Sequence, residues 1–386
     1  MRTCITAGRI FTPLESIESG MVVIENGKIA SVTARAERDL ASGAEHLDFP
    51  DLVLAPGYID VHVHGGAGHD VMQDDPSGRI AFERALARHG VTSYLATTVT
   101  APMERILGAL DRLAGVVTAE REPVGARPLG IHLEGPFISP RKCGVHPVDH
   151  LVDPTLERFE KMWEASGGTL KMMTIAPELP GAEPVIAEAL KRGVHSSLGH
   201  SDATFASTRN AIEAGATHAT HTFNAMRALD HREPGILGAV LTDDRLMADI
   251  IVDGIHVSPA MVKLFLKAKG PELAVLITDA ISATGMPDGT YQLGGFKVQV
   301  RGDRCELEGK LAGSVLTMDR AVRNVMSFAE WSLQRTIALA TKNPSCLLGL
   351  TSTKGILAKG ADADLILLTP AGEVAHTFVA GRMVKD

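Results

Sequence analysis

The pattern of apolar and polar residues divides the chain into two β-rich ends and a middle with a different period. In the ends, short alternating runs without helical patterns between them predict strands. The Asn26-Gly27 pair stands between two such runs and predicts a tight hairpin, because both turn positions favour a positive φ. Since chain termini often lie close together, we expect the ends to pair into one small β-sandwich domain of residues 1–54 and 350–386. The strand-like pieces are Arg9–Phe11, Gly20–Glu25, Lys28–Thr33, Ile356–Leu357, Ala363–Leu368 and Thr377–Met383.

The middle of the chain alternates short β-branched or apolar runs with helical periods of 10 to 16 residues. Repeated β/α units over about 250 residues predict a (β/α)₈ TIM-like barrel, here residues 55–349, with its active site at the carboxyl ends of the strands. The candidate strands are Gly57–His64, Thr92–Thr100, Leu129–Glu134, Leu170–Pro177, Val194–His200, His218–Asn224, Met247–Asp253 and Ala274–Asp279. The candidate helices include Pro76–His89, Pro102–Val117, Pro154–Ser166, Glu183–Arg192, Thr204–Ala214 and Ser258–Ala268.

Side chains that can bind a metal fall at the ends of these predicted strands. Because side chains alternate along a strand, His62 and His64 share one face and both can point into the mouth of the barrel. Imidazole nitrogens together with a carboxylate suit Zn²⁺, Fe²⁺ or a similar divalent ion. The strand-end residues are His62, His64, Glu134, His200, His221, Asp253 and Asp279.

Each of these residues also has a structural interpretation. A lone strand histidine is often a hydrogen-bonded core residue, and Asp279 could cap a helix or anchor a loop. The coincidence of five candidate ligands and an Asp at predicted barrel strand ends favours the metal site. An unpaired carboxylate after an apolar run is costly, so we interpret Asp279 as a general base that takes a proton from water and returns it to a leaving group. His132, which shares a face with Glu134, is predicted to support the ligands.

Charge and composition narrow the classes of partner. The 386 residues contain 38 Lys and Arg against 46 Asp and Glu, a net charge of −8, and the basic residues do not cluster. We therefore expect no nucleic-acid partner. No apolar run approaches the roughly 18 residues that span a bilayer, and the start lacks an apolar signal-peptide segment, so no membrane association is expected. Four widely separated cysteines without a CxxC motif fit a reducing compartment, and we expect a cytoplasmic protein.

The ordered set of strand-end residues resembles the amidohydrolase superfamily, and its surroundings are similar to one family within it, the N-acetylglucosamine-6-phosphate deacetylases. The similarity runs from about Pro56 to Ser314, in the order of the family. The β-rich ends also suit the split small domain of that family. The motifs are HLEGPFISP (132–140), GVHP (144–147), LGHSDA (198–203), THTFNAM (220–226), REPG (232–235), DGIH (253–256), TDAISATG (278–285) and LAGS (311–314).

The resemblance implies hydrolysis of the acetamido group of N-acetyl-D-glucosamine 6-phosphate to D-glucosamine 6-phosphate and acetate, in amino-sugar catabolism or cell-wall recycling. It implies Glu134, His200 and His221 as ligands of the main metal, Asp279 as catalytic acid and base, and His146 beside the acetamido carbonyl. It further implies a homodimer in which the neighbouring subunit supplies part of the phosphate site. The implied substrate-binding residues are Val145, His146, Asn224, Ala225, Arg232, Asp253, His256, Leu311, Ala312 and Gly313.

Several alternatives stay open at this point. Both histidines of the HxH pair are present, so His62 and His64 allow a second metal ion, and the sequence leaves one or two divalent ions, Zn²⁺ or Fe²⁺, undecided. A cyclic-amide hydrolase or deaminase of the same superfamily is the competing activity. A catalytically inactive barrel is disfavoured because every ligand is present. Cys143 is either a plain loop cysteine or an oxidation-sensitive thiol beside the site.

Overall fold

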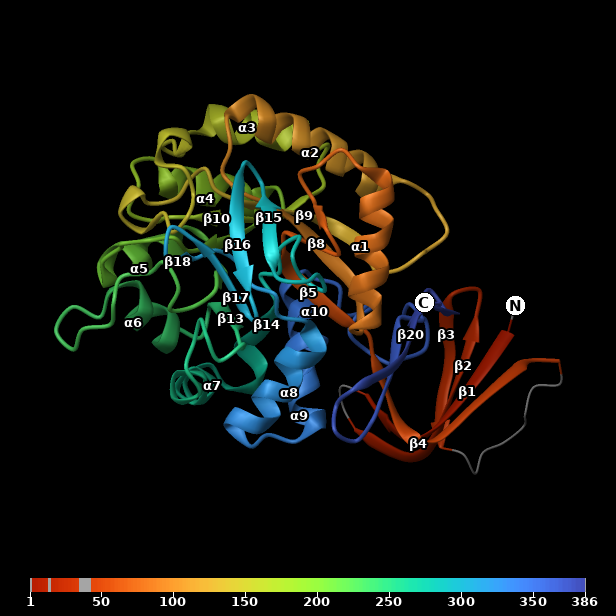
Figure 1. Ribbon diagram of the computed structural model, residues 1–386. Coiled ribbons are helices and arrows are strands. Elements are labelled where there is room, and N and C mark those ends of the chain that lie inside the picture. Colours follow the sequence, from red (N-terminus) through yellow and green to blue (C-terminus); the bar gives the residue numbers. More distant parts are fainter. Residues whose placement is uncertain (1, 13–14, 35–42, 386) are drawn as a thin grey trace.

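The computed structural model describes residues 2–12, 15–34 and 43–385. Residues 1, 13–14, 35–42 and 386, which belong to the predicted terminal domain, lie outside the described residues. Two bodies make up the molecule in Figure 1, a large barrel and a smaller sheet beside it. Both termini lie in the smaller sheet, as expected from the β-rich chain ends.

Eight parallel strands form the barrel, in the order in which they occur along the chain. The ring closes where Val63 pairs with Ala280 and the His64 amide donates to the Ala280 carbonyl at 2.8 Å. All eight predicted strands are confirmed, although most are shorter than predicted. The strands are β5 (Tyr58–Val63), β8 (Val91–Thr98), β9 (Arg127–Glu134), β10 (Leu170–Ile175), β11 (His195–Leu198), β12 (His218–Ala219), β13 (Met247–Ile251) and β14 (Ala274–Ile277).

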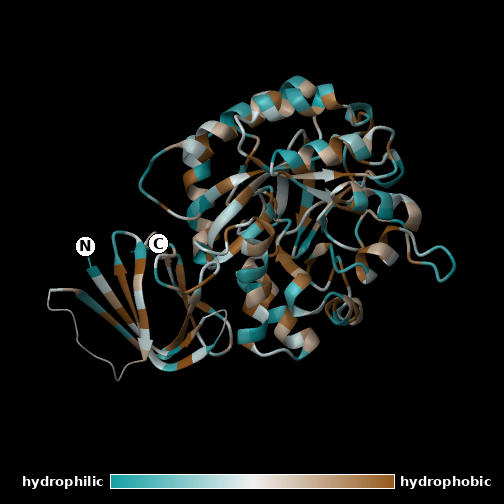
Figure 2. Ribbon diagram, turned by 180° about the vertical axis from the view of Figure 1, so that it is seen from behind, coloured by the Kyte–Doolittle hydropathy of each residue, from teal (hydrophilic) through white to brown (hydrophobic). Residues whose placement is uncertain are grey.

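Helices cover the outside of the barrel (Figure 1), which is why the strands are buried along almost their whole length. Figure 2 shows hydrophobic and hydrophilic residues alternating along these helices. Asp75, Thr155 and Thr204 each accept backbone hydrogen bonds and so fix the starts of α1, α3 and α5. The helices are α1 (Pro76–Arg88), α2 (Met103–Thr118), α3 (Leu156–Ala165), α4 (Ala182–Lys191), α5 (Phe205–Ala214), α6 (Gly235–Thr242), α7 (Pro259–Leu273), α8 (Met318–Ala329), α9 (Leu333–Ile337) and α10 (Lys342–Leu347).

The two chain ends share one seven-stranded sheet, in the order β21-β20-β19-β4-β1-β2-β3. Asn26 and Gly27 adopt φ values of 51° and 76°, so the predicted hairpin turn is confirmed. The sheet curls until the Ile29 amide donates to the Ala361 carbonyl at 2.9 Å, which encloses an apolar core that includes Leu54 and Leu365. The strands are β1 (Arg2–Phe11), β2 (Ser16–Glu25), β3 (Lys28–Ala34), β4 (Glu45–Pro56), β19 (Leu365–Leu368), β20 (Val374–Val379) and β21 (Arg382–Met383).

The expected fold class, a barrel with a small β domain built from both chain ends, is confirmed by this arrangement. The domain boundaries at 54/55 and 349/350 stay a prediction, and β4 runs across the first of them. Among the described residues, no helix is both long and apolar enough to cross a membrane.

A four-stranded antiparallel sheet, absent from the sequence predictions, follows β14 and lies across the middle of the barrel in the view of Figure 1. The alternation Phe296-Lys297-Val298-Gln299-Val300 after Gly294-Gly295 is a hairpin signal that could have revealed it. A two-residue pair, β6 (Gly65–Gly66) with β7 (His69–Asp70), lies after β5. The four strands are β15 (Gly289–Leu293), β16 (Phe296–Arg301), β17 (Arg304–Leu307) and β18 (Lys310–Leu311).

Substitution of Leu365 tests whether the C-terminal strand completes the small domain. Leu365 is fully buried between β4 and β20, so Leu365→Ala should lower the free energy of unfolding by about 2–5 kcal/mol through lost burial and a cavity. Leu264 on α7 is 43% exposed, and Leu264→Ala should change it by no more than about 0.5 kcal/mol. Denaturant unfolding of both variants measures the difference. Equal stability of the two would contradict this role of β19.

Candidate metal centre and active site

The predicted site residues converge at the carboxyl end of the barrel. Three of the predicted metal-binding and catalytic residues sit in the left-handed region of backbone space, with φ values of 48° for His200, 29° for His221 and 51° for Asp279. Such positions cost about 1–3 kcal/mol each for residues with a side chain, and they persist where surrounding contacts fix them. The Asp279 amide donates to the His62 carbonyl at 2.9 Å, and the His221 amide donates to the Asp249 carboxylate.

Five imidazoles surround the buried carboxylate of Glu134. Its Oε1 lies 3.1 Å from His221 Nε2, 3.3 Å from His200 Nε2 and 3.4 Å from His62 Nε2. Its Oε2 lies 3.3 Å from His64 Nε2 and 3.5 Å from His146 Nε2. Both oxygens of Glu134 therefore lie close to imidazole nitrogens that could share a metal ion with this carboxylate.

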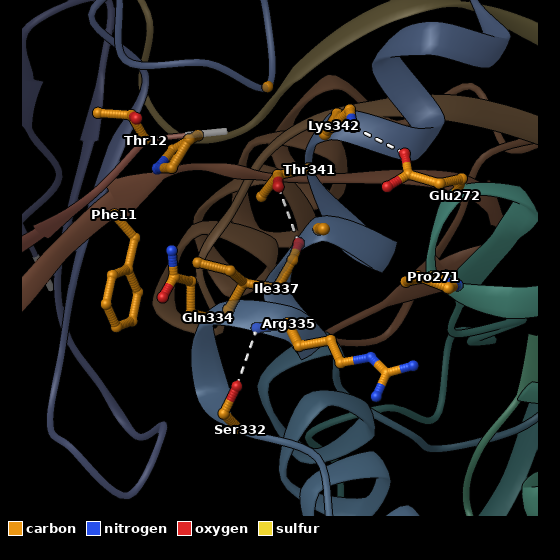
Figure 3. A pocket seen from close by; sticks show the side chains of 13 residues that line it. Phe11, Thr12, Pro271, Glu272, Ser332, Gln334, Arg335, Ile337, Thr341 and Lys342 are labelled. Atoms are coloured by element: carbon orange, nitrogen blue, oxygen red, sulfur yellow. Dashed lines mark hydrogen bonds and ion pairs between the residues drawn. The ribbon is translucent and has the colours of Figure 1, made fainter. Parts of the chain in front are cut away.

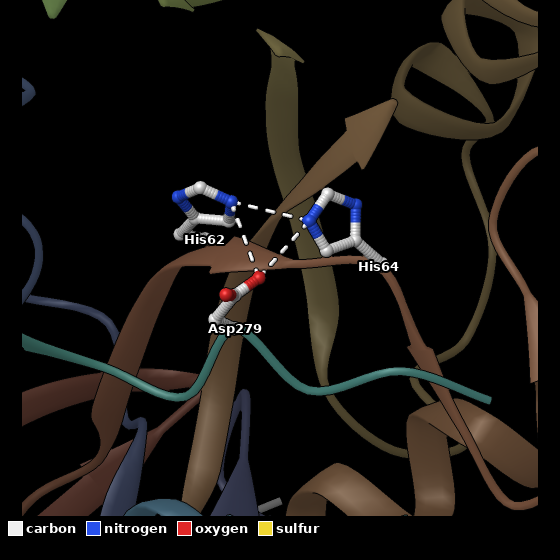
Figure 4. Close-up of side chains that lie close together, drawn as sticks. All are labelled: His62, His64 and Asp279. Carbon is white, nitrogen blue, oxygen red and sulfur yellow. Dashed lines mark hydrogen bonds and ion pairs between the residues drawn. The ribbon is translucent and has the colours of Figure 1, made fainter. Parts of the chain in front are cut away.

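Two triads of donor atoms have the spacing of a tetrahedral metal site. With metal–nitrogen bonds of about 2.0–2.1 Å, two ligand atoms of a tetrahedral ion lie about 3.3 Å apart. In the triad Glu134, His200 and His221, the two Nε2 atoms are 3.1 Å apart. In the triad of Figure 4, His62 Nε2 is 3.2 Å from His64 Nε2, and Asp279 Oδ1 is 3.1 Å from His64 and 3.5 Å from His62.

The hydrogen bonds made by Nδ1 show that two of the predicted ligand histidines, His64 and His200, differ from His146 in their tautomer. A carbonyl only accepts, so His64 Nδ1 donates to the Thr97 carbonyl at 2.9 Å, and His200 Nδ1 donates to the Lys142 carbonyl at 2.9 Å. The neutral ring then presents its Nε2 lone pair to the centre. With Nδ1 of His64 and His200 engaged by carbonyls, and Nε2 atoms of neighbouring histidines 3.1–3.2 Å apart, these residues fit a divalent metal ion.

His146 has the opposite tautomer. Its Nδ1 accepts from the Thr100 backbone amide at 3.3 Å and lies 2.8 Å from the Thr100 hydroxyl. The proton of the neutral ring is therefore on Nε2, which faces the centre as a donor. Burial lowers the pKa of His146 to about 4, so the ring stays neutral. This arrangement suits a donor to a carbonyl oxygen.

The carboxylates at the centre are ionised despite their burial. Burial opposes ionisation of Glu134, but the charge of His62 and hydrogen bonds from three other histidines hold its pKa well below its usual range. Burial also opposes ionisation of Asp279, but its hydrogen bond with His64 and the charges of the HxH pair lower its pKa to about 2. Burial acts to lower the pKa of His64, yet the same two carboxylates raise it to about 10. A proton and a metal ion therefore compete for His64 Nε2.

A buried polar layer beneath the centre holds the ligands, and the sequence predictions missed most of it. Asp60 accepts from the His62 amide at 3.2 Å and from the Thr278 hydroxyl at 2.6 Å. His132 donates to the Val61 carbonyl at 3.0 Å and lies 2.8 Å from the Thr174 hydroxyl, and its role in supporting the ligands stays a prediction. Asp60 comes two residues before the HxH pair on the same strand face, a spacing that could have singled it out.

A cavity of about 280 Å³ opens at the metal centre. Of the predicted substrate-binding residues, Val145, His146, Asn224, Ala225, His256, Leu311 and Gly313 line it. Three do not. Asp253 holds His256 Nδ1 at 2.6 Å, Ala312 is buried behind the wall, and Arg232 lies exposed on the loop before α6. Cys143 is half-buried beside Gly144, and its thiol lies 3.8 Å from the Gly144 carbonyl.

Another cavity, of about 300 Å³, lies between the small sheet and α9 and α10 (Figure 3). Phe11 and Arg335 lie on its walls, and Lys342 pairs with Glu272 at 2.7 Å across its edge. None of the predicted site residues is among those that line it, so it is separate from the metal centre.

The barrel and its strand-end donors define a class, the metal-dependent hydrolases of the TIM-barrel type. The model of the Amidohydrolase family matches residues 53–384, and the chain belongs to that family. N-acetylglucosamine-6-phosphate deacetylase of Bacillus subtilis (strain 168) is 38% identical over 97% of this chain and 95% of its own length. N-acetylgalactosamine-6-phosphate deacetylase of Escherichia coli O157:H7 is 38% identical over the whole of both chains.

Solved structures agree with these relatives. A point mutant of N-acetyl-D-glucosamine-6-phosphate deacetylase from Mycobacterium smegmatis, in complex with N-acetyl-D-glucosamine-6-phosphate, superposes with a TM-score of 0.92 at 36% identity and covers all of both chains. The deacetylase from Pasteurella multocida superposes with a TM-score of 0.93 at 28% identity, again over both full chains. The resemblance seen in the sequence motifs is thereby confirmed.

Metal content tests the two triads. Protein loaded with Zn²⁺ and dialysed should lose at least one equivalent per chain in His221→Ala, since a tetrahedral site tolerates the loss of a protein ligand poorly. In an enzyme that binds two ions, His62→Ala should lose the other equivalent, the one at the triad of His62, His64 and Asp279. His46 is exposed on β4, and His46→Ala should retain the full complement. Elemental analysis gives the stoichiometry, and an unchanged metal content in His221→Ala would exclude this site.

Proposed function

We propose that the chain hydrolyses the acetamido group of N-acetyl-D-glucosamine 6-phosphate to D-glucosamine 6-phosphate and acetate, in the cytoplasm, in amino-sugar catabolism or cell-wall recycling. The observation that carries this is the pairing of a donor, His146 Nε2, with an ionised carboxylate, Asp279, beside one metal centre. An amide needs both, a donor to its oxygen and an acid for its nitrogen. Relatives that act on phosphorylated amino sugars support the choice of substrate.

The metal is proposed to be Zn²⁺ or Fe²⁺, with one or two ions per subunit. Glu134, His200 and His221 would hold the main ion, and His62 and His64 a second one. When bound, a divalent ion lowers the pKa of coordinated water toward about 7 and polarises a carbonyl oxygen.

Asp279 carries the proton of the reaction. Its ionised carboxylate can accept a proton from the attacking water and then deliver it to the amine nitrogen as the C–N bond breaks. A carboxylate with a pKa of about 2 is a weak base. Asp279 therefore depends on the bound divalent ion, which would make the attacking water more acidic, to capture a proton. His146 meanwhile donates Nε2–H to the carbonyl oxygen and stabilises the negative charge that develops there.

Phosphate recognition is proposed to combine groups from two subunits. His256 lines the cavity, and its ring is fixed by Asp253 through Nδ1, which leaves Nε2 for the ligand. Asn224 and Ala225 lie on the cavity wall after β12. Arg232 is exposed, and the loop that carries it projects from the barrel before α6 in Figure 1. A homodimer would bring this Arg, whose planar fork suits phosphate, to the cavity of the neighbouring subunit.

The competing activity, hydrolysis of a cyclic amide or deamination by the same centre, requires no phosphate pocket. Metal-loaded protein should release amine from N-acetylglucosamine 6-phosphate far faster than from unphosphorylated N-acetylglucosamine. Asp279→Asn should lower kcat by about 10²–10⁴-fold, because the amide cannot accept and return the proton. N-acetylgalactosamine 6-phosphate, assayed in parallel, shows how strictly the sugar is recognised. Asp279→Asn with near-normal turnover, or no amine release from the phosphorylated sugars, would overturn the proposal.

Mixing two impaired variants tests the contribution of the neighbouring subunit. Arg232→Ala should raise KM for the phosphorylated sugar, and Asp279→Asn should remove turnover. Mixed dimers of the two contain one cavity with both Asp279 and an intact Arg232 from the neighbour, so activity should reappear after subunit exchange. Exchange of Arg232→Ala with itself is the control. No recovery in exchanged dimers would place Arg232 outside the phosphate site.

A further inference from the structure

An apolar wall closes the cavity next to the metal centre. Val99, which follows β8, and Leu293, the last residue of β15, both line the cavity that Glu134 and His146 also line. Each is only 3% exposed. One residue of the wall, Val99, therefore comes from the barrel, and the other, Leu293, comes from the four-stranded sheet of β15–β18, which Figure 1 shows lying across the barrel.

Val99 lies between the two residues that orient the catalytic imidazoles. Two residues before it, the Thr97 carbonyl holds His64 Nδ1 at 2.9 Å. One residue after it, the Thr100 amide and hydroxyl hold His146 Nδ1 at 3.3 Å and 2.8 Å. The position of Val99 relative to the reacting carbonyl is thus set by the same segment that sets the ligand and the donor.

The other half of the wall is pinned by its neighbour Gly294. The Gly294 amide donates to Asp70 Oδ2 at 2.7 Å, and its carbonyl accepts from Arg105 Nη2 at 2.9 Å. Gly294 has a φ of +53°, and a Cβ there would stand 2.2 Å from Val99 Cγ2. The tip of the β15–β16 hairpin is therefore packed directly onto Val99, and only glycine fits this contact.

The reacting carbonyl carbon has three substituents, and two have places in the proposed function, on which this step rests. Its oxygen faces His146. Its nitrogen is bonded to the sugar, whose phosphate lies near Asn224 and His256. We propose that the third substituent, the acyl chain, lies against Val99 and Leu293, and that this wall restricts the substrate to an acyl group of about the size of acetyl. A longer chain must displace a hairpin that hydrogen bonds hold at both sides of Gly294.

A series of acyl chains tests this wall. The metal-loaded enzyme is assayed for amine release from N-acetyl-, N-propionyl- and N-butyryl-glucosamine 6-phosphate. Since one methylene in an apolar pocket is worth about 10–200-fold in kcat/KM, the unmodified enzyme should prefer acetyl over propionyl by at least about tenfold. Leu293→Ala should shrink this ratio by about tenfold, and Val99→Ala should shift it in the same direction.

Leu307→Ala is the matched control, because Leu307 is half-buried on β17 of the same sheet and does not line the cavity. It should leave the acetyl-to-propionyl ratio unchanged. Val99→Ala carries the test should Leu293→Ala fail to fold. An unchanged ratio in both variants, with N-acetyl substrate still cleaved, would overturn the acyl wall alone. No cleavage of the N-acetyl substrate by the unmodified enzyme would overturn the proposed function and the wall with it.

Discussion

The arrangement of the site depends on one buried carboxylate. Glu134 is 3% exposed and has the imidazoles of five histidines within 3.5 Å. A carboxylate buried in this way is stable only with such compensation, because an unpaired charge is very costly in a protein interior. The Nε2 atoms of neighbouring histidines lie 3.1–3.2 Å apart, a spacing at which they could share one cation. Metal binding, ionisation of Glu134 and convergence of the strand ends are therefore mutually dependent.

That dependence explains the polar interior beneath the centre. His200, His221 and Asp279 take up left-handed backbone positions, and the cost is offset by hydrogen bonds rather than by apolar burial. Asp60 and Asp249 accept backbone amides of the ligands, so the barrel strands are held in register at the point where the metal binds. At this end of the barrel, buried polar residues therefore replace apolar core and hold the ligands in fixed positions. Electrostatic catalysis depends on such pre-organisation.

The barrel and the metal-binding residues could be predicted from the sequence because both produce patterns that are local along the chain. The run Val275–Thr278 before Asp279, like the spacing of His62 and His64, needs no tertiary information to interpret. The tautomers of His64 and His146 could not be predicted, because they depend on Thr97 in β8 and on Thr100 just after it. The β15–β18 sheet was missed for a different reason: its alternating residues fall inside a stretch assigned to the barrel, after the last strand that was predicted there.

The metal-binding side chains and part of the cavity wall are therefore carried by different parts of the molecule. The strand ends supply donors that tolerate little change, since each is linked to the others through Glu134. The cavity above them is closed by Leu293 and Leu311 from the added sheet. Substitutions there alter the shape of the cavity without disturbing the ligands. The chain is 38% identical to a deacetylase named for N-acetylglucosamine 6-phosphate and 38% identical to one named for N-acetylgalactosamine 6-phosphate. These two sugars are epimers at a carbon away from the reacting amide, so this division lets one scaffold serve deacetylases of both names.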